Sequence, residues 1–289
     1  MEAHPQPATH HVLDTPELLE MILAQPDLDM RTLLTSAQRV CRTWANLIRT
    51  SPTIQRALFF APSRGSDRGL NDKEKILNPL LAETFHSIFQ QPSDKDEHPQ
   101  LKFSDLAMTK DAGAMARFVR KDASWRRMLV TQPPLFDIAV FNVRSSRGGR
   151  SAEISSIPAD KESGLEGLRM RTLFDSLLFS SRIRFHGVTT IRVFWDLGNA
   201  RNSRMTKQQG LQSRKIQKRF DQVLREFGLV IYTSKVVQCC PQRNSRLGAE
   251  ELVKGRIVKA YEEQGFDVEF LEKVIELNRK DIGLLRAHR

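Results

Sequence analysis

Three prolines divide the N-terminal part of the chain into short segments: Pro16, Pro26 and Pro52. Proline has no backbone N–H and is tolerated only in the first turn of an α-helix, so a long helix cannot run through any of these positions. Around them, apolar residues recur three and four positions apart, which is the spacing of one helical face. The sequence therefore predicts three short amphipathic helices ahead of Pro52 and a further short helix in TIQRALFF.

Each of these helices has a recognisable beginning or a recognisable apolar face. Thr15 is placed to cap the first helix and Asp29 to cap the second. The third contains VCRTWANLI, residues 40–48, which carries Val, Cys, Trp, Leu and Ile on one short stretch. Helices this short bury too little surface to form a robust unit alone, and an apolar remainder on the surface usually marks a partner. We therefore expect VCRTWANLI to form one wall of a helical interface.

The order and spacing of these residues closely resemble the F-box motif, in the form found in fungal F-box proteins. TPELLEMIL resembles the first helix of the motif, LDMRTLL the second and VCRTWANLI the third. Two positions depart from the pattern, because Thr15 stands where leucine is usual and Glu17 directly follows Pro16. Phrases further along the chain, such as SPTIQRALFFAP and ASWRRMLVTQPP, are also similar to that group. The matching residues are Pro16, Leu18, Leu19, Ile22, Leu23, Leu33, Leu34, Val40, Cys41, Arg42, Trp44, Leu47 and Ile48.

The resemblance implies a receptor subunit of a cullin–RING ubiquitin ligase of the SCF type, which carries out no bond chemistry itself. In such ligases the F-box docks on the Skp adaptor and the rest of the chain recruits a protein substrate for ubiquitination. The matching residues would form the adaptor-binding surface, with Trp44 as its main anchor, because buried aromatic residues dominate interface hot spots. The resemblance implies neither a cofactor nor a metal, and it leaves the substrate open.

The remaining sequence predicts a mixed α+β region. The segments LFDIAVFNV, TTIRVFWDL and LVIYTSKVVQC have the composition of strands, so at least three strands are expected. A run rich in Ser, Gly and Arg at about 144–163 predicts a flexible link. The expected organisation is a disordered N-terminus at 1–11, an F-box at 12–60, a linker at 61–74, the α+β region at 75–240 and a helical, mixed-charge extension at 241–289.

The net charge of +11 suits an acidic partner of any kind, including nucleic acid. Several basic residues fall on one predicted helix, where they could neutralise phosphates or hold an acidic or phosphorylated substrate. The simplest interpretation is a solvated basic helix. A nucleic-acid-binding protein is the main alternative to the receptor hypothesis. The residues of this basic helix are Arg214, Lys215, Lys218, Arg219 and Arg225.

A metal-dependent nuclease is a remote alternative. Asp196 ends the predicted strand that contains VFWD, and Asp221 and Asp267 could join it as ligands. However, no second acidic motif has an informative spacing, and a lone aspartate at the end of a strand is usually a turn or cap residue.

The three cysteines, Cys41, Cys239 and Cys240, lack the spacing of a zinc site. Cys41 is expected on the apolar helix face, where a buried cysteine behaves as an inert small hydrophobe. The odd number of cysteines favours a reducing compartment, the cytoplasm or the nucleus. No apolar run approaches the length of a membrane span and no secretory signal is recognisable, so we expect no membrane partner.

Overall fold

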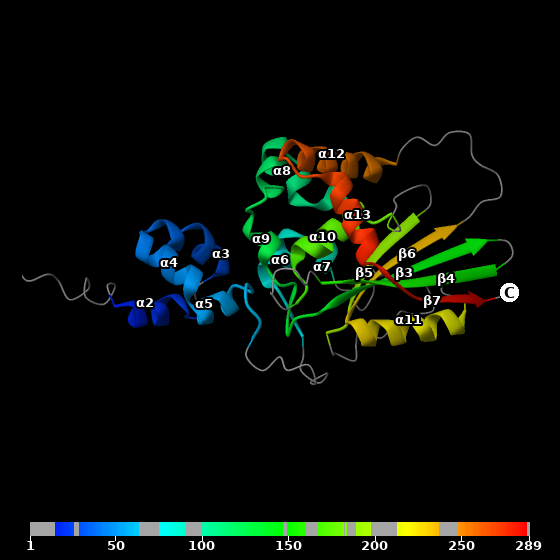
Figure 1. Cartoon of the computed structure of the whole chain (residues 1–289), viewed down its shortest axis with the longest axis horizontal. Helices are drawn as coiled ribbons and strands as arrows, with labels where there is room; N and C mark the ends of the chain where they lie inside the picture. The colour runs from blue at the N-terminus through cyan, green and yellow to red at the C-terminus, as the bar shows by residue number, and fades with distance from the viewer. Residues whose placement is uncertain are drawn as a thin grey trace, which may run out of the picture. The chain divides into compact units, whose positions relative to one another are not determined.

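The computed structural model describes residues 15–25, 29–63, 75–90, 100–146, 149–159, 167–181, 183, 189–197, 213–236 and 248–287 (Figure 1). The chain divides into two compact units, Met1–Arg64 and Gly65–Arg289. The boundary between them lies within 61–74, the stretch that the sequence suggests as a linker. Residues 1–11, predicted to be disordered, lie outside the described residues.

The first unit is built from short helices, as the positions of the prolines predict. Thr15, Asp29 and Ser51 occupy N-cap positions, and Pro16 and Pro52 are the first residues of their helices. The helices described in this unit are α2 (Pro16–Leu23), α3 (Met30–Thr35), the 3₁₀ turn η1 (Ala37–Arg39), α4 (Arg42–Thr50) and α5 (Pro52–Ala57).

Ser51 holds α2 and α5 together. Its hydroxyl donates to Glu20 Oε1 on α2 and accepts the Ile54 N–H of α5 at 3.1 Å. The cap of one helix is therefore also a link to another helix, which compensates for the small apolar core. The side chains that fill this core are almost completely buried: Leu19, Leu23, Leu33, Ile48, Ile54 and Leu58.

The second unit is organised around a five-stranded mixed sheet. In spatial order its strands are β5 (Thr189–Trp195), β6 (Leu229–Val236), β3 (Asp137–Ser146), β4 (Gly149–Pro158) and β7 (Lys280–Ala287). β3 and β4 form an antiparallel hairpin, and β6 runs parallel to β3. The edge strands β5 and β7 are antiparallel to β6 and β4. The expectation of at least three strands in a mixed α+β region is thereby confirmed.

Helix α11 (Arg214–Phe227) covers one face of this sheet (Figure 1). Phe220 at its centre meets Phe141 of β3 and Phe194 of β5 edge to face, with ring centroids 5.3 and 5.0 Å apart. Gly228, with φ of +72°, ends the helix in the left-handed conformation that glycine adopts readily, and the chain turns directly into β6.

The opposite face of the sheet meets helices from elsewhere in the unit. Successive strand residues point to opposite faces, so Trp195 points away from the face that carries Phe194. Trp195 stacks on Phe89 at 5.0 Å and donates its indole N–H to the carbonyl of Ile88 at 3.0 Å. The other described elements of this unit are α6 (Pro79–Thr84), α7 (His86–Phe89), η2 (Phe103–Asp105), η3 (Ala107–Thr109), α8 (Ala112–Phe118), α9 (Ser124–Arg127), α10 (Met170–Phe179), α12 (Ala249–Glu263), α13 (Val268–Asn278) and a small antiparallel pair, β1 (Ile76–Leu77) with β2 (Thr131–Gln132).

The flexible link predicted at about 144–163 is wrong for most of its length. Residues 149–158 form β4, which pairs along its length with β3 on one side and with β7 on the other. Ser155 and Ser156 are buried in this central position. The composition is that of a linker, but hydrogen bonding to two neighbouring strands determines the structure of the segment.

The helical extension predicted at 241–289 is also corrected. Residues 280–287 form the edge strand β7, and Glu276 pairs with Arg279 just before it. Tyr261 of α12 is completely buried, so this part of the chain contributes to the core of the second unit. The spacing of DIGLLRA suits a helix and a strand equally, and β4 provides the partner that favours the strand. Residues 241–247 lie outside the described part.

Candidate protein-binding surfaces

The residues that resemble the F-box motif divide into three groups by their exposure in the first unit. The inner group forms the core and consists of Leu19, Leu23, Leu33 and Ile48. The intermediate group is half-buried and consists of Ile22, Leu34, Trp44 and Leu47. The exposed group consists of Pro16, Leu18, Val40, Cys41 and Arg42. The inner residues build the unit, and the other two groups leave apolar surface available to a partner.

The helical segment at residues 40–48 begins later than the sequence predicts. Cys41 has an extended backbone, with φ of −161° and ψ of 173°, and is the N-cap of α4, so Val40 and Cys41 precede the helix. The expectation that Cys41 is a buried side chain is wrong, because its thiol is free and exposed. A helix begins after its N-cap residue, so the helical spacing does not extend back to Val40 and Cys41. Neither side chain therefore lies on the apolar face that the spacing predicts.

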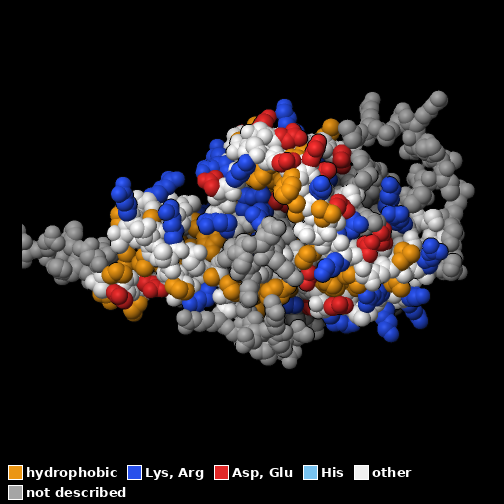
Figure 2. Space-filling view, in the orientation of Figure 1, with side chains coloured by type: hydrophobic (Ala, Val, Ile, Leu, Met, Phe, Trp, Pro, Cys, Tyr) orange, Lys and Arg blue, Asp and Glu red, His pale blue; other side chains and the backbone are white. Residues whose placement is uncertain are grey.

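Large apolar side chains are exposed on the first unit. Leu18, Met21 and Val40 are 42%, 69% and 60% exposed. Leu18 and Met21 are three residues apart on α2 and therefore lie on one face of that helix. Figure 2 shows hydrophobic side chains gathered over this helix. Met21 was not predicted as part of this surface, although its spacing from Leu18 in the sequence is a signal that would have identified it.

Trp44 is half-buried on α4, so part of its ring surface remains outside the core. A ring that is only partly covered can still be buried by a partner, and aromatic rings contribute much of the binding energy when an interface closes over them. The position of Trp44 therefore suits the anchor role that the resemblance implies.

The five basic residues predicted to hold an acidic partner all lie on α11 in the second unit. Ile216, Phe220 and Val223 face the sheet and are buried, so α11 is strongly amphipathic. Figure 2 shows Lys and Arg side chains along this helix. Arg214, Lys215, Lys218 and Arg225 are exposed and Arg219 is half-buried.

The aspartates of the nuclease alternative have structural partners. The backbone N–H of Asp196 donates to the Gly228 carbonyl at 2.8 Å, and the Asp267 carboxylate accepts the Phe270 N–H at 2.9 Å as the cap of α13. Asp221 accepts from Gln217 at 3.0 Å, and burial raises the pKa of its carboxyl. Among the described residues, no group of three or more His, Cys, Asp or Glu could hold a metal ion. Cys239 and Cys240 lie outside this part of the chain.

A buried polar network in the second unit was not predicted from the sequence. Arg126 Nη2 lies 3.0 Å from Asp175 Oδ2, and Arg126 Nη1 donates to the Tyr261 hydroxyl at 2.9 Å. The Tyr261 hydroxyl in turn donates to Asp175 Oδ1 at 2.9 Å. Burial raises the pKa of Asp175, which Arg126 opposes, and burial also raises the pKa of Tyr261. The network joins α9, α10 and α12 and has a structural role, because all three side chains are closed to solvent.

Comparison of the chain with family models, curated proteins and solved structures finds no match. In the described residues, no helix combines the length and apolar character needed to cross a membrane.

Proposed function

We propose that this protein is an F-box substrate receptor. Its first unit would dock on the Skp adaptor of a cullin–RING ligase of the SCF type, and its second unit would recruit a protein substrate for ubiquitination. The observation that carries the proposal is the exposure of Leu18 and Val40, since both belong to the motif and neither is needed for the core.

The energetics support an adaptor interface of this kind. Burying one large apolar side chain stabilises a complex by about 1.5–3 kcal/mol before the costs of association. Several such side chains on one small unit, together with the half-buried Trp44, provide the apolar anchors that a stable interface needs. The interface would depend on apolar contact, so its affinity would change little with salt.

A receptor of this type acts by position and carries out no bond chemistry. It raises the effective concentration of substrate lysines near a charged ubiquitin-conjugating enzyme. This activity would take place in the cytoplasm or the nucleus.

The test is size-exclusion chromatography with light scattering of the chain mixed with the purified Skp adaptor, at low and high salt. We expect a 1:1 complex at both salt concentrations, and we expect Leu18→Asp combined with Val40→Asp to abolish it. Both side chains are exposed, so the variant should fold, whereas a substitution at the buried Leu23 would disrupt the unit itself. Asn46→Asp, at an exposed position of α4, is the matched control. The absence of a complex, or a complex unaffected by the double substitution, would overturn the proposal.

Nucleic-acid binding is a second candidate function, and the basic face of α11 favours it. Exposed Lys and Arg on one helix can neutralise phosphates and release counterions. Such binding weakens steeply with ionic strength, so a gel-shift titration over a range of salt concentrations separates it from adaptor docking. Binding that is lost on Lys215→Glu with Lys218→Glu would support this function, and salt-independent binding would exclude it.

A further inference from the structure

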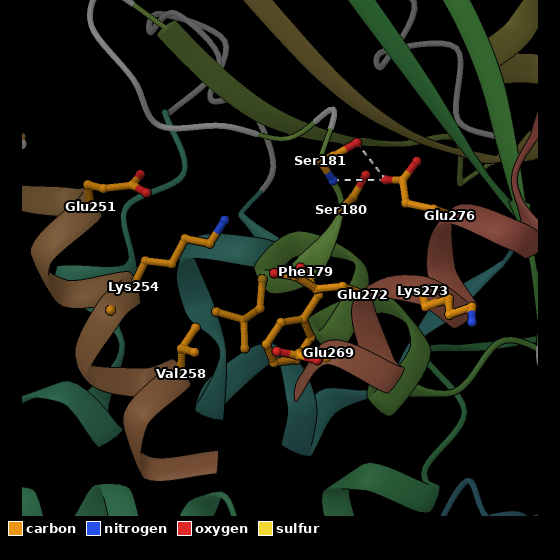
Figure 3. Close-up of a pocket in the computed structure, with 12 residues that line it drawn as sticks. Phe179, Ser180, Ser181, Glu251, Lys254, Val258, Glu269, Glu272, Lys273 and Glu276 are labelled. Atoms are coloured by element: carbon orange, nitrogen blue, oxygen red, sulfur yellow. Dashed lines mark hydrogen bonds between the residues drawn. The ribbon is translucent and has the colours of Figure 1, made fainter. Parts of the chain in front are cut away.

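A groove in the second unit lies between α12, α13 and the end of α10 (Figure 3). Its volume is about 590 Å³, which is comparable to the clefts that hold small ligands or short peptide segments. Val258 of α12 is half-buried and contributes apolar surface to its lining, whereas Phe179 of α10 also lines it but is only 3% exposed. The described residues that line it all belong to the second unit.

The two helices present matching faces to the groove. On α12 the lining residues are Glu251, Lys254, Gly255 and Val258, and on α13 they are Glu269, Glu272, Lys273 and Glu276. Both sets follow the spacing i, i+3, i+4 and i+7, which is one continuous helical face. Each helix therefore turns a full stripe of side chains towards the groove rather than an isolated residue.

The groove is acidic although the chain is basic. Four of its lining residues are glutamates and two are lysines, against a net charge of +11 for the whole chain. In Figure 3 the side chain of Lys273 extends away from α12. The groove therefore favours a cationic occupant, in contrast to the basic face of α11.

The glutamates differ in how far the protein already uses them. Glu276 accepts the Ser181 N–H at 2.9 Å and the Ser181 hydroxyl at 2.8 Å, and it also pairs with Arg279. In contrast, Glu251 Oε2 is buried and has no hydrogen-bond partner in the described part of the chain. A buried carboxylate oxygen without a donor is costly, and an ammonium or guanidinium group in the groove would satisfy it.

Gly255 is the second sign that the groove is shaped for an occupant. It lies in the middle of α12, where glycine lowers helix stability relative to alanine. Its backbone is not in the left-handed region, and a Cβ built on it would meet no atom of the described residues within 4 Å. Neither its backbone conformation nor its packing against those residues therefore requires glycine here. A glycine that lines a groove allows a ligand to approach the helix backbone closely.

We propose that this groove binds a segment of a partner protein that carries Lys or Arg beside apolar residues. Glu251, Glu269 and Glu272 would hold the cation, and the segment would pass over Gly255 against Val258. The inference rests on the proposed receptor function, because it assigns the substrate a basic recognition segment. Phe270 and Leu277 are exposed on a face of α13 next to the groove, where they would contact the apolar residues of a segment that extends across the helix.

The experiment selects short random peptides from a displayed library on the full-length chain, and then measures the affinity of selected peptides by fluorescence anisotropy. We expect the selected peptides to be enriched in Lys or Arg. Gly255→Trp, which fills the groove from a position with free space, should weaken their binding by about tenfold or more. Glu269→Lys with Glu272→Lys should weaken it by a similar factor because it reverses the charge of the α13 face. Leu252→Trp, at an exposed position of α12 that does not line the groove, is the matched control and should bind normally.

Three results would overturn the inference. They are selection of acidic or uncharged peptides, selection of the same peptides by the Gly255→Trp chain, and no enrichment at all. Peptide binding is measured without the adaptor, and Gly255→Trp should still form the adaptor complex. Peptide binding without an adaptor complex would therefore refute the receptor function alone, and an adaptor complex without peptide binding would refute the groove alone.

Discussion

Arg126 and Asp175 form an ion pair that is almost completely closed to solvent, with Nη2 and Oδ2 3.0 Å apart and side chains only 4% and 7% exposed. The Tyr261 hydroxyl bonds to both partners, so the pair is enclosed by a third polar group. Arg126 also lies over the rings of Trp125 and Phe266, at 5.2 and 4.7 Å from their centroids. The network connects α12 to the rest of the second unit and therefore helps to position the groove.

Arg126→Met is expected to destabilise the second unit by about 3–5 kcal/mol at neutral pH, because it leaves Asp175 buried without a cationic partner. Urea unfolding monitored by circular dichroism measures the change. Asp122→Asn removes an exposed pair with Arg120 and is the control, with a much smaller expected effect because solvent screens exposed charges. Equal losses in the two variants would contradict the structural role of the network.

The loss of stability that Arg126→Met causes should depend on pH. Burial already raises the pKa of Asp175, and removing Arg126 removes the main influence that lowers it. A carboxyl whose folded pKa lies above its unfolded value contributes stability below the unfolded pKa, near 4, and this stability is lost as the pH rises towards the folded pKa. The difference from the unchanged chain should therefore be smallest near pH 3.5 and larger at pH 7. A deficit that is constant over this range would show that Asp175 does not respond to Arg126.

Two glycines at helices should respond in opposite directions to alanine. Gly255→Ala is expected to stabilise the second unit by about 0.5–1 kcal/mol, since a Cβ fits there and helix propensity improves. Gly228→Ala is expected to destabilise it by about 1–3 kcal/mol, because φ is +72° and the Cβ would lie 2.8 Å from Leu135 Cδ2. Thermal unfolding of the two variants measures the contrast. A stabilising Gly228→Ala would contradict the left-handed end of α11.

The sheet could be predicted from the sequence only where the pattern is local. β3, β5 and β6 are rich in Phe, Ile and Val and were identified, whereas β4 contains the buried Ser155 and Ser156 and reads as a linker. The fold of β7 depends on pairing with β4, which is more than 100 residues earlier in the chain. A short stretch of sequence carries no signal of its pairing with a distant strand. Where the spacing of apolar residues suits both a helix and a strand, the partner strand determines which of the two forms.

The candidate binding surfaces could likewise be predicted from the sequence only where they depend on a local pattern. The basic face of α11 follows from the sequence because the helix is long and its apolar residues define the buried side. The exposure of Val40 could not be predicted, because it depends on α4 beginning only at Arg42. The groove could not be predicted either, because Glu251 and Glu272 have the spacing of ordinary solvated faces until α12 and α13 are placed beside each other.

In the first unit, Ser51→Ala is expected to destabilise α5 by about 1 kcal/mol, since it removes both the helix cap and the link to Glu20. The loss should appear as faster amide hydrogen exchange in residues 53–57. Thr53→Ala, at an exposed position of the same helix, is the control and should change the exchange much less. Equal exchange in the two variants would show that the Ser51 side chain does not hold α5.

Neighbouring leucines of β7 provide a direct test of the strand that replaces the predicted helix. Leu285 packs against the core beneath α11, whereas Leu284 points away from it and is exposed. Leu285→Asp is therefore expected to cost about 2 kcal/mol or more, because it places a charge against the core, and Leu284→Asp should stay within about 0.5 kcal/mol. Urea unfolding measures both variants, and each is the control for the other. If the two substitutions had equal effects, the alternation of a strand would be absent and the assignment of residues 280–287 to the edge of the sheet would be wrong.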